Sequence, residues 1–276
     1  MPISPSEFDF VRELVRQRSA IVLEPGKEYL VESRLGTVAR TEGFASLEQF
    51  LAELRNQPAN GLHARVVEAM TTNETTFFRD IHPFDALRDA IIPDLLQRRA
   101  AERQLTIWCA ASSSGQEPYS IAMLLREKGA QLAGWRIRIL GTDLSGEMIA
   151  RAREARYSQV EMNRGLPAPL LVKYFIKQGL EWQLKDDIRQ MVEYREMNLA
   201  APWPVLPAPD IVFIRNVLIY FDVATKKEIL AKIRQAMRPD GYLFLGGAET
   251  TLNLDDAFHR TPLGKATAYR LIPPAK

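Results

Sequence analysis

The first seventy residues carry apolar side chains at the spacing of an α-helix. Residues 4–18 begin with polar residues and then place Phe8, Val11 and Val15 on one stripe, as in an amphipathic helix. The same period recurs in three further stretches, residues 27–40, 46–56 and 62–70. We therefore expect a small all-α domain over residues 1–70, with no strand and no catalytic chemistry in it.

From residue 105 onward, β-like runs alternate with helical patterns. The strand candidates are residues 105–110, 136–143, 210–216 and 242–247, with helix candidates at 118–129, 145–154 and 224–237. Strands that alternate with helices form a mostly parallel sheet covered on both faces. A last strand-like run, at residues 266–272, is expected to return along the edge of this α/β sheet.

Two segments interrupt this alternation. Residues 172–198 form an insertion in which apolar positions recur with period two, as in strands, and we expect a small antiparallel β-subdomain there. Residues 201–209 are proline-rich and predict a loop. The predicted organisation is a helical domain over 1–70 and a second domain over 71–276 that carries the insertion.

Composition restricts the class of protein. The net charge of +2 gives no reason to expect nucleic acid or an anionic membrane as a partner, and no stretch suits insertion into a bilayer. Cys109 is the one cysteine, and the N-terminal residues have acids where a secretory signal needs an apolar core. We therefore expect a cytoplasmic protein. The three histidines are scattered, so no metal site is predicted.

An acidic glycine loop follows the first predicted strand of the sheet. Residues 111–116 are small or polar, and Glu117 and Pro118 then open a helix. The loop lacks both the dinucleotide pattern and the triphosphate pattern. A carboxylate at Glu117 would repel a phosphate in a poorly solvated cleft but would attract a cation. Asp143, at the end of the second strand, is placed to accept the hydroxyl groups of a ribose.

These two acids together indicate a nucleoside cofactor that carries positive charge and no phosphate, which is S-adenosylmethionine. Each acid also has an ordinary structural interpretation. Glu117 suits the start of a helix whose first turn contains Pro118, and Asp143 could cap the helix that begins at Ser145. Either interpretation alone is as good as the functional one, but the pair at matching strand ends favours a binding site.

Three stretches give the chain a specific resemblance. TTNETTFFRD (71–80), SGQEPYS (114–120) and IRNVLIYFD (214–222) together resemble the CheR family of chemotaxis receptor methyltransferases. HPF (82–84), MNL (197–199) and RPDGYLFLGGAE (238–249) extend the resemblance over nearly the whole chain. The chain departs from the family at Ala111, where many members have glycine, at Gln116, a common glutamate, and at Gly247-Ala248, a common His-Ser.

The resemblance implies a Rossmann-like S-adenosylmethionine-dependent methyltransferase domain preceded by an all-α domain. It implies methyl transfer to glutamate side chains on the cytoplasmic helices of chemoreceptors, with S-adenosylhomocysteine as the product. Matched position by position, the implied cofactor contacts are Asn73, Thr75, Arg79, Glu117, Asp143, Asn198, Leu199, Arg215 and Asn216. Without the resemblance, Asn73 and Thr75 would be interpreted as capping residues.

The reaction that the resemblance implies needs no general base. A glutamate carboxylate has an unperturbed pKa of about 4.3, so the nucleophile is already ionised at neutral pH. We expect Arg79 and Arg215 to position groups, mainly the cofactor carboxylate, and Tyr220 to donate a hydrogen bond near the reacting centre. A packing role for Tyr220 is equally compatible with the sequence.

Two alternatives remain open at this stage. One is a methyltransferase of another substrate class, although Asn216 is followed by Val217 and Leu218 and not by the Pro-Pro-Tyr of adenine methylation. The other is a non-catalytic scaffold or sensor that binds the cofactor. The intact set of predicted contact residues argues against a scaffold.

Some members of the family capture a peptide at the receptor's C-terminus on the inserted sheet. Those members have additional glycines in its turn, whereas here Gly179 stands alone before the bulky Leu180. The acids Glu181, Asp186 and Asp187 would also repel a terminal carboxylate. We expect no C-terminal pentapeptide tether and direct docking on receptor helices.

Overall fold

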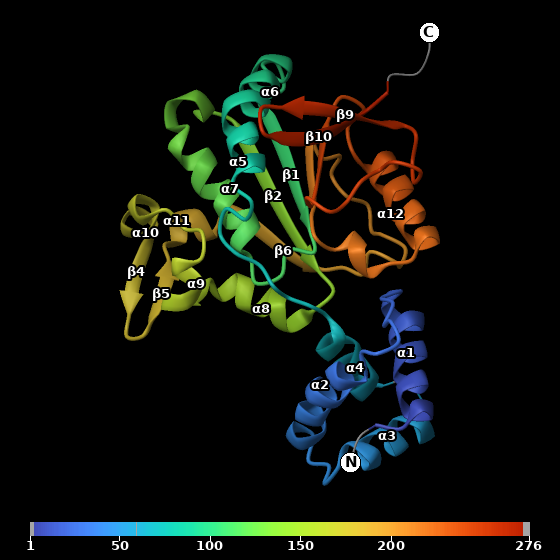
Figure 1. The fold of residues 1–276 in the computed structure, drawn as a ribbon. Coiled ribbons are helices and arrows are strands. Elements are labelled where there is room, and N and C mark those ends of the chain that lie inside the picture. Colours follow the sequence, from blue (N-terminus) through green and yellow to red (C-terminus); the bar gives the residue numbers. More distant parts are fainter. Residues whose placement is uncertain (1–2, 59, 273–276) are drawn as a thin grey trace.

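The computed structural model describes residues 3–58 and 60–272, and it begins with the expected helical domain (Figure 1). Its helices are α1 (Pro5–Ser19), α2 (Glu28–Thr41), α3 (Leu47–Asn56) and α4 (Gly61–Met70). Ser4 starts α1 with a capping box, because its hydroxyl accepts from the Glu7 N–H while the Glu7 carboxylate accepts from the Ser4 N–H. The stripe of Phe8, Val11 and Val15 is buried in this domain's own core.

The second domain is built on a seven-stranded sheet in the order β6-β2-β1-β7-β8-β10-β9. Its strands are β1 (Gln104–Ala110), β2 (Arg136–Asp143), β6 (Val192–Glu196), β7 (Ile211–Ile214), β8 (Tyr242–Leu245), β9 (Phe258–Leu263) and β10 (Ala266–Leu271). Neighbours from β6 to β8 pair in parallel, and β10 pairs antiparallel with both β8 and β9. The predicted α/β fold with a returning edge strand is confirmed.

Helices cover both faces of this sheet, and β1 shows why. Ile107 and Cys109 pack on one side, while Trp108 and Ala110 pack on the other, so alternate residues enter two separate cores. The first core is shared with α5 (His82–Ala86), the π-helical turn η1 (Leu87–Ile91), α6 (Ile92–Arg98), α7 (Gln116–Glu127) and α8 (Gly146–Glu154). The second is shared with α12 (Val223–Ala236).

A small antiparallel sheet interrupts the chain between β2 and β7, as predicted, but its strands differ from those expected. It has the order β3-β5-β4, formed by β3 (Arg156–Ser158), β4 (Phe175–Gln178) and β5 (Glu181–Leu184). Residues 191–197, which the sequence assigned to the insertion, contain β6, and β6 pairs with β2 in the main sheet. Val192 and Tyr194 are buried there, so the period-two pattern reflects the edge of the main sheet.

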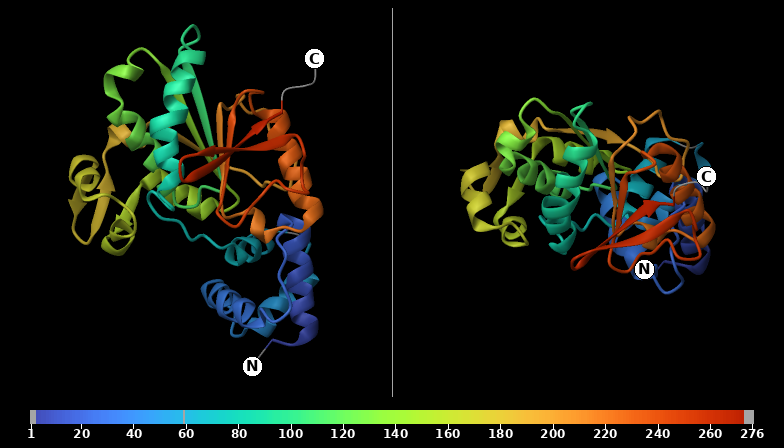
Figure 2. Two further views of the ribbon diagram at one scale, coloured as in Figure 1. Left: turned by 45° about the horizontal axis from the view of Figure 1, so that its top comes forward. Right: turned by 90° about the horizontal axis from the view of Figure 1, so that it is seen from above.

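The remaining short elements frame the small sheet and the loops. They are η2 (Gly129–Leu132), α9 (Gln159–Asn163), α10 (Ala168–Tyr174), α11 (Asp186–Arg189) and η3 (Leu218–Tyr220). In all views the small sheet lies on the side of the molecule opposite α12 (Figures 1 and 2). Among the described residues, no helix has the length and apolar composition needed to cross a bilayer.

The helical domain is bonded to the second domain at several points. Ile21 forms an isolated antiparallel bridge with Phe221, and the Val22 N–H donates to the Tyr220 carbonyl over 2.9 Å. At a second point, Glu68 of α4 accepts from the Ser145 hydroxyl and from the Glu147 N–H at the start of α8. The two domains are therefore joined by hydrogen bonds as well as by the chain.

Candidate functional site

Three adjacent parallel strands end at one edge of the main sheet, and the predicted site residues follow these ends. Ala110 of β1 lies opposite Thr142 of β2 and Ile214 of β7, so the next residues of all three strands emerge side by side. In open α/β sheets, ligands bind at this edge.

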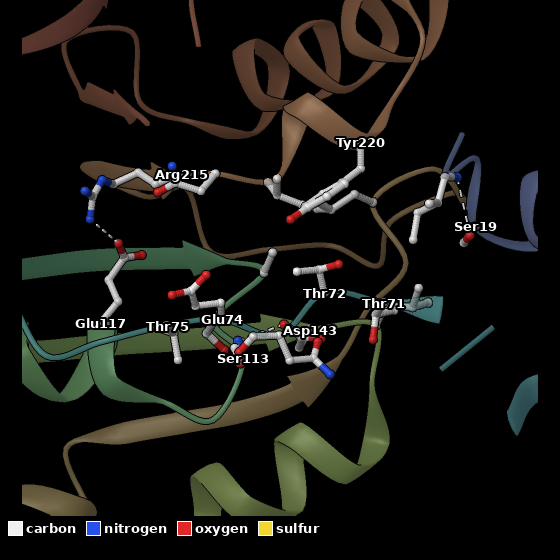
Figure 3. Close-up of a pocket in the computed structure, with 18 of the residues that line it drawn as sticks. Ser19, Thr71, Thr72, Glu74, Thr75, Ser113, Glu117, Asp143, Arg215 and Tyr220 are labelled. Carbon is white, nitrogen blue, oxygen red and sulfur yellow. Dashed lines mark hydrogen bonds and ion pairs between the residues drawn. The ribbon is translucent and has the colours of Figure 1, made fainter. Parts of the chain in front are cut away.

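The ten residues singled out in the sequence all line one pocket at this edge (Figure 3). They are Asn73, Thr75, Arg79, Glu117, Asp143, Asn198, Leu199, Arg215, Asn216 and Tyr220. They come from the linker after α4, the start of α7, the ends of β2 and β7, and the loop after β6. In the view of Figure 3, Tyr220 and Asp143 approach from opposite sides, with the Glu117–Arg215 pair at one end.

Asp143 is buried, with its carboxylate bonded to two backbone N–H groups. Oδ2 accepts from the Ser113 N–H over 2.8 Å and Oδ1 from the Ser145 N–H over 2.9 Å. Burial raises the pKa of the Asp143 carboxyl, and these backbone bonds act in the opposite direction. Ser145 itself is the N-cap of α8, so the capping interpretation of Asp143 does not hold. A carboxylate has about four acceptor positions, which leaves two for a ligand such as a diol.

Glu117 and Arg215 form a buried ion pair at the other end of the pocket. Arg215 Nη1 donates to Glu117 Oε2 over 2.8 Å, and Arg215 Nη2 donates to Asp80 Oδ2 and to the Arg79 carbonyl. Burial raises the pKa of the Glu117 carboxyl, and the guanidinium opposes that shift. The pair leaves one face of the Glu117 carboxylate toward the pocket, where it favours a cationic ligand.

The glycine loop after β1 requires an unusual backbone. Gly115 has φ +93°, and a Cβ atom there would lie 2.6 Å from the Tyr194 hydroxyl, so glycine is needed. Ala111, the position where the resemblance leads one to expect glycine, has φ +57°, which a residue with a side chain adopts at some cost. Tyr157 supports the loop from the core, donating to the Ser114 carbonyl over 2.8 Å.

Asn216 and Tyr220 contribute polar groups from the segment after β7. Asn216 has φ +58°, and its buried Oδ1 has no hydrogen-bond partner among the described residues. Asn216 is part of the pocket lining, and an unpaired buried acceptor next to a binding site is expected where a ligand can supply the donor. Tyr220 lies at the end of η3, and its hydroxyl forms no hydrogen bond with any described part of the chain.

Three of the other predicted residues form hydrogen bonds within the protein. The Asn198 side chain donates to the Arg18 carbonyl over 2.7 Å and accepts from the Ala200 N–H. Arg79 Nη1 donates to the Glu74 carbonyl over 2.9 Å, and the Asn73 carbonyl accepts from the Ser113 hydroxyl. These bonds tie the linker and the loop after β6 to the walls of the pocket.

Two residues of the helical domain, Ser19 and Ile21, also line the pocket. The helical domain, for which we expected no chemistry, therefore supplies part of a wall of the pocket. The Ser19 hydroxyl donates to the Val15 carbonyl one turn earlier in α1, a bond that serine residues commonly form in helices. The sequence offers no signal that separates Ser19 and Ile21 from ordinary helix-end residues.

Comparison with known proteins agrees with this geometry. The model of the all-alpha domain of CheR methyltransferases matches residues 6–71, and that of their S-adenosylmethionine-binding domain matches residues 73–266. Chemotaxis protein methyltransferase 1 of Pseudomonas aeruginosa is 40% identical over 98% of this chain and 99% of its own. Chemotaxis protein methyltransferase Cher2 of Pseudomonas putida is 39% identical, covering 96% and 97%.

A third relative, chemotaxis protein methyltransferase 1 of Vibrio cholerae, is 37% identical over 98% of each chain. Two family models together span almost the entire sequence, and the relatives align from end to end. The chain belongs to the CheR methyltransferase family, and its second domain is the one that binds S-adenosylmethionine.

Proposed function

We propose that this methyltransferase esterifies glutamate side chains of chemoreceptors. The relatives are named as chemotaxis protein methyltransferases, which points to receptors as the substrate class. The observation that carries the choice of a carboxylate is the composition of the pocket. Among the described residues that line it, none is a histidine, lysine or cysteine. A carboxylate nucleophile needs no base to remove a proton, so such a pocket suffices.

The acids of the pocket are committed to other tasks. Glu117 is paired with Arg215, Glu74 with Arg164, and Asp143 accepts two backbone N–H groups, so we assign none of the three as a general base. We assign Asp143 to the ribose hydroxyls of the cofactor and Glu117 to its cationic end. The unpaired Asn216 Oδ1 suits the ammonium group, and Asn73, Thr75, Asn198 and Leu199 complete the walls.

S-adenosylmethionine supplies a methyl group made electrophilic by the sulfonium sulfur. The charges of the two reactants disappear in this transfer, so exclusion of water and alignment give most of the acceleration. Arg215 is bonded to Glu117, Asp80 and the Arg79 carbonyl, and we assign it a positioning role. Arg79 uses one nitrogen on the Glu74 carbonyl, and we assign the rest of its fork to the cofactor carboxylate. Tyr220 is assigned as a hydrogen-bond donor to the reacting groups.

Incubation with radiolabelled S-adenosylmethionine and receptor-containing membranes tests the proposed substrate. We expect label on the receptor that is released as methanol by mild base, as a methyl ester requires. Membranes without receptor are the control. Base-stable label, or label on nucleic acid or small molecules only, would place the enzyme in another substrate class. The same experiment tests the proposed cytoplasmic setting, because only inside-out vesicles should be labelled.

The ribose assignment predicts weaker binding when Asp143 is replaced. Asp143→Ala should weaken S-adenosylhomocysteine binding by roughly 1–3 kcal/mol, the range for loss of a charged hydrogen bond. Asp143→Asn retains one acceptor oxygen and should lose less. Titration calorimetry measures both, with thermal unfolding to confirm the fold. Unchanged affinity in a folded Asp143→Ala protein would contradict the assignment of Asp143 to the ribose hydroxyls.

Replacement of Tyr220 by phenylalanine distinguishes a catalytic role of its hydroxyl from a packing role of its ring. If its hydroxyl orients the reacting groups, Tyr220→Phe should lower kcat while leaving cofactor affinity nearly intact. Tyr29→Phe, at an exposed tyrosine of the helical domain, is the matched control and should change neither. Parallel losses of thermal stability and cofactor binding in Tyr220→Phe would indicate packing instead.

We also propose that the enzyme does not bind the C-terminal peptide of a receptor as a tether. The structure weakens one argument for it, because Glu181 pairs with Arg156, and Asp186 and Asp187 pair with Arg189 and Arg126. These acids are therefore partly neutralised. The turn between β4 and β5 supports the proposal, since it contains only Gly179 and Leu180, and Gln178 already pairs with Glu181.

Calorimetric titration with a receptor C-terminal pentapeptide should accordingly show no heat of binding. Titration of the same sample with S-adenosylhomocysteine is the positive control for active protein. Methylation of a receptor lacking its tail should proceed at the rate of the intact receptor. Micromolar binding of the pentapeptide, or loss of methylation on tail deletion, would contradict direct docking on receptor helices.

A further inference from the structure

Glu249 lies outside the pocket, in the turn after β8, and its carboxylate is surrounded by backbone donors. Oε2 accepts from the N–H groups of Asn216 and Gly246 over 2.8 and 2.6 Å. Oε1 accepts from the N–H groups of Val217 and Leu218 over 2.9 and 2.7 Å. The four donors follow the ends of the neighbouring parallel strands β7 and β8, so one side chain joins both strand ends.

A carboxylate fits this arrangement and an amide does not. Two oxygens that each accept two N–H groups use acceptor positions that a carboxylate has and an amide lacks, since an amide offers a single oxygen and an NH₂ group. Hydrogen bonds to a charged acceptor are also stronger than neutral ones. The neighbouring glycine is required as well. A Cβ atom at Gly246 would lie 2.7 Å from Glu249 Oε2 and 2.8 Å from the Asn216 nitrogen.

The segment that Glu249 holds forms one wall of the cofactor pocket. Asn216, Val217, Tyr220 and Phe221 line the pocket, and the backbone bonds to Glu249 fix the first two of them. Asn216 has a left-handed backbone, φ +58°, a conformation that asparagine adopts more readily than most residues with a side chain. The bond from its N–H to Glu249 holds this backbone in place where the residue lines the pocket.

We infer that Glu249 is a positioning residue for methyl transfer: it touches neither cofactor nor substrate, and it acts through the backbone of residues 216–218. Through Asn216 it sets cofactor affinity, and through η3 it sets the place of Tyr220. The role of Tyr220 rests on the proposed function, whereas the effect on cofactor binding does not. Binding therefore provides a test that is independent of which carboxylate the enzyme methylates.

Glu249→Gln is nearly isosteric and tests the inference. We expect S-adenosylhomocysteine binding to weaken roughly tenfold, the size that loss of charged hydrogen bonds produces. In an Asn216→Ala background the same change should cost little more, because the group through which Glu249 acts is gone. Glu249→Asp keeps both acceptor oxygens and should recover part of the affinity. Equal losses in the two backgrounds would overturn the inference.

Asp222→Asn is the matched control. Asp222 follows the same segment and caps α12 by accepting from the Thr225 N–H over 2.8 Å, and asparagine caps a helix equally well. This variant loses a charge and the exposed contact with Arg16 but keeps the oxygen that caps the helix, and it should keep wild-type affinity. If Glu249→Gln does not fold, Gly246→Ala displaces the same carboxylate and should reproduce the affinity loss. Wild-type affinity in either folded variant would overturn the inference.

Turnover gives a second readout. Glu249→Gln should lower kcat more than it raises the KM for the receptor, and the loss of kcat should be smaller in a Tyr220→Phe background. A change that only loosened the fold would lower thermal stability and both kinetic constants together. Failure of wild-type protein to methylate receptors would count against the proposed substrate and would leave the binding results to decide on Glu249.

Discussion

The buried guanidinium of Arg215 holds together the edge of the sheet on which the cofactor pocket is built. It bonds to Glu117 at the start of α7 and to Asp80 and the Arg79 carbonyl in the linker from the helical domain. These groups lie more than ninety residues from Arg215 in sequence. Removing one member of a buried ion pair leaves an uncompensated charge, which is strongly destabilising. The pocket therefore depends on an arginine whose two terminal nitrogens both bond within the protein.

The same guanidinium explains a strained stretch of backbone. Phe78, Asp80 and Ile81 have φ values of +48°, +67° and +35°, all in a region that side chains disfavour. Such conformations persist where surrounding contacts determine them, and they gather at functional sites. Here Arg215 bonds to the backbone and side chain within this stretch. This strained stretch places Arg79 at the pocket and Phe78 in the core.

Local patterns predicted the sheet and the places of Glu117 and Asp143, whereas the other pocket residues were predicted only through the resemblance to a family. Asp143 and Glu117 follow strands whose apolar runs are unmistakable, and parallel strands bring their carboxyl ends together. The pairing of strands that lie far apart in the sequence was harder to predict. The period-two pattern around Tyr194 is compatible with a strand of either sheet. Only the structure shows that this strand pairs with β2 in the seven-stranded sheet. Ser19 and Glu249 were missed because their roles consist of contacts that no local pattern records.

The position of Tyr220 shows how these long-range contacts combine. Its carbonyl accepts from the Val22 N–H of the segment after α1, and its neighbour Phe221 forms a bridge with Ile21. Asn198, another residue of the pocket lining, donates to the Arg18 carbonyl near the end of α1. The helical domain thus bonds to two walls of the pocket at once. Because both walls belong to the pocket, a shift of the helical domain would change the shape of the pocket directly.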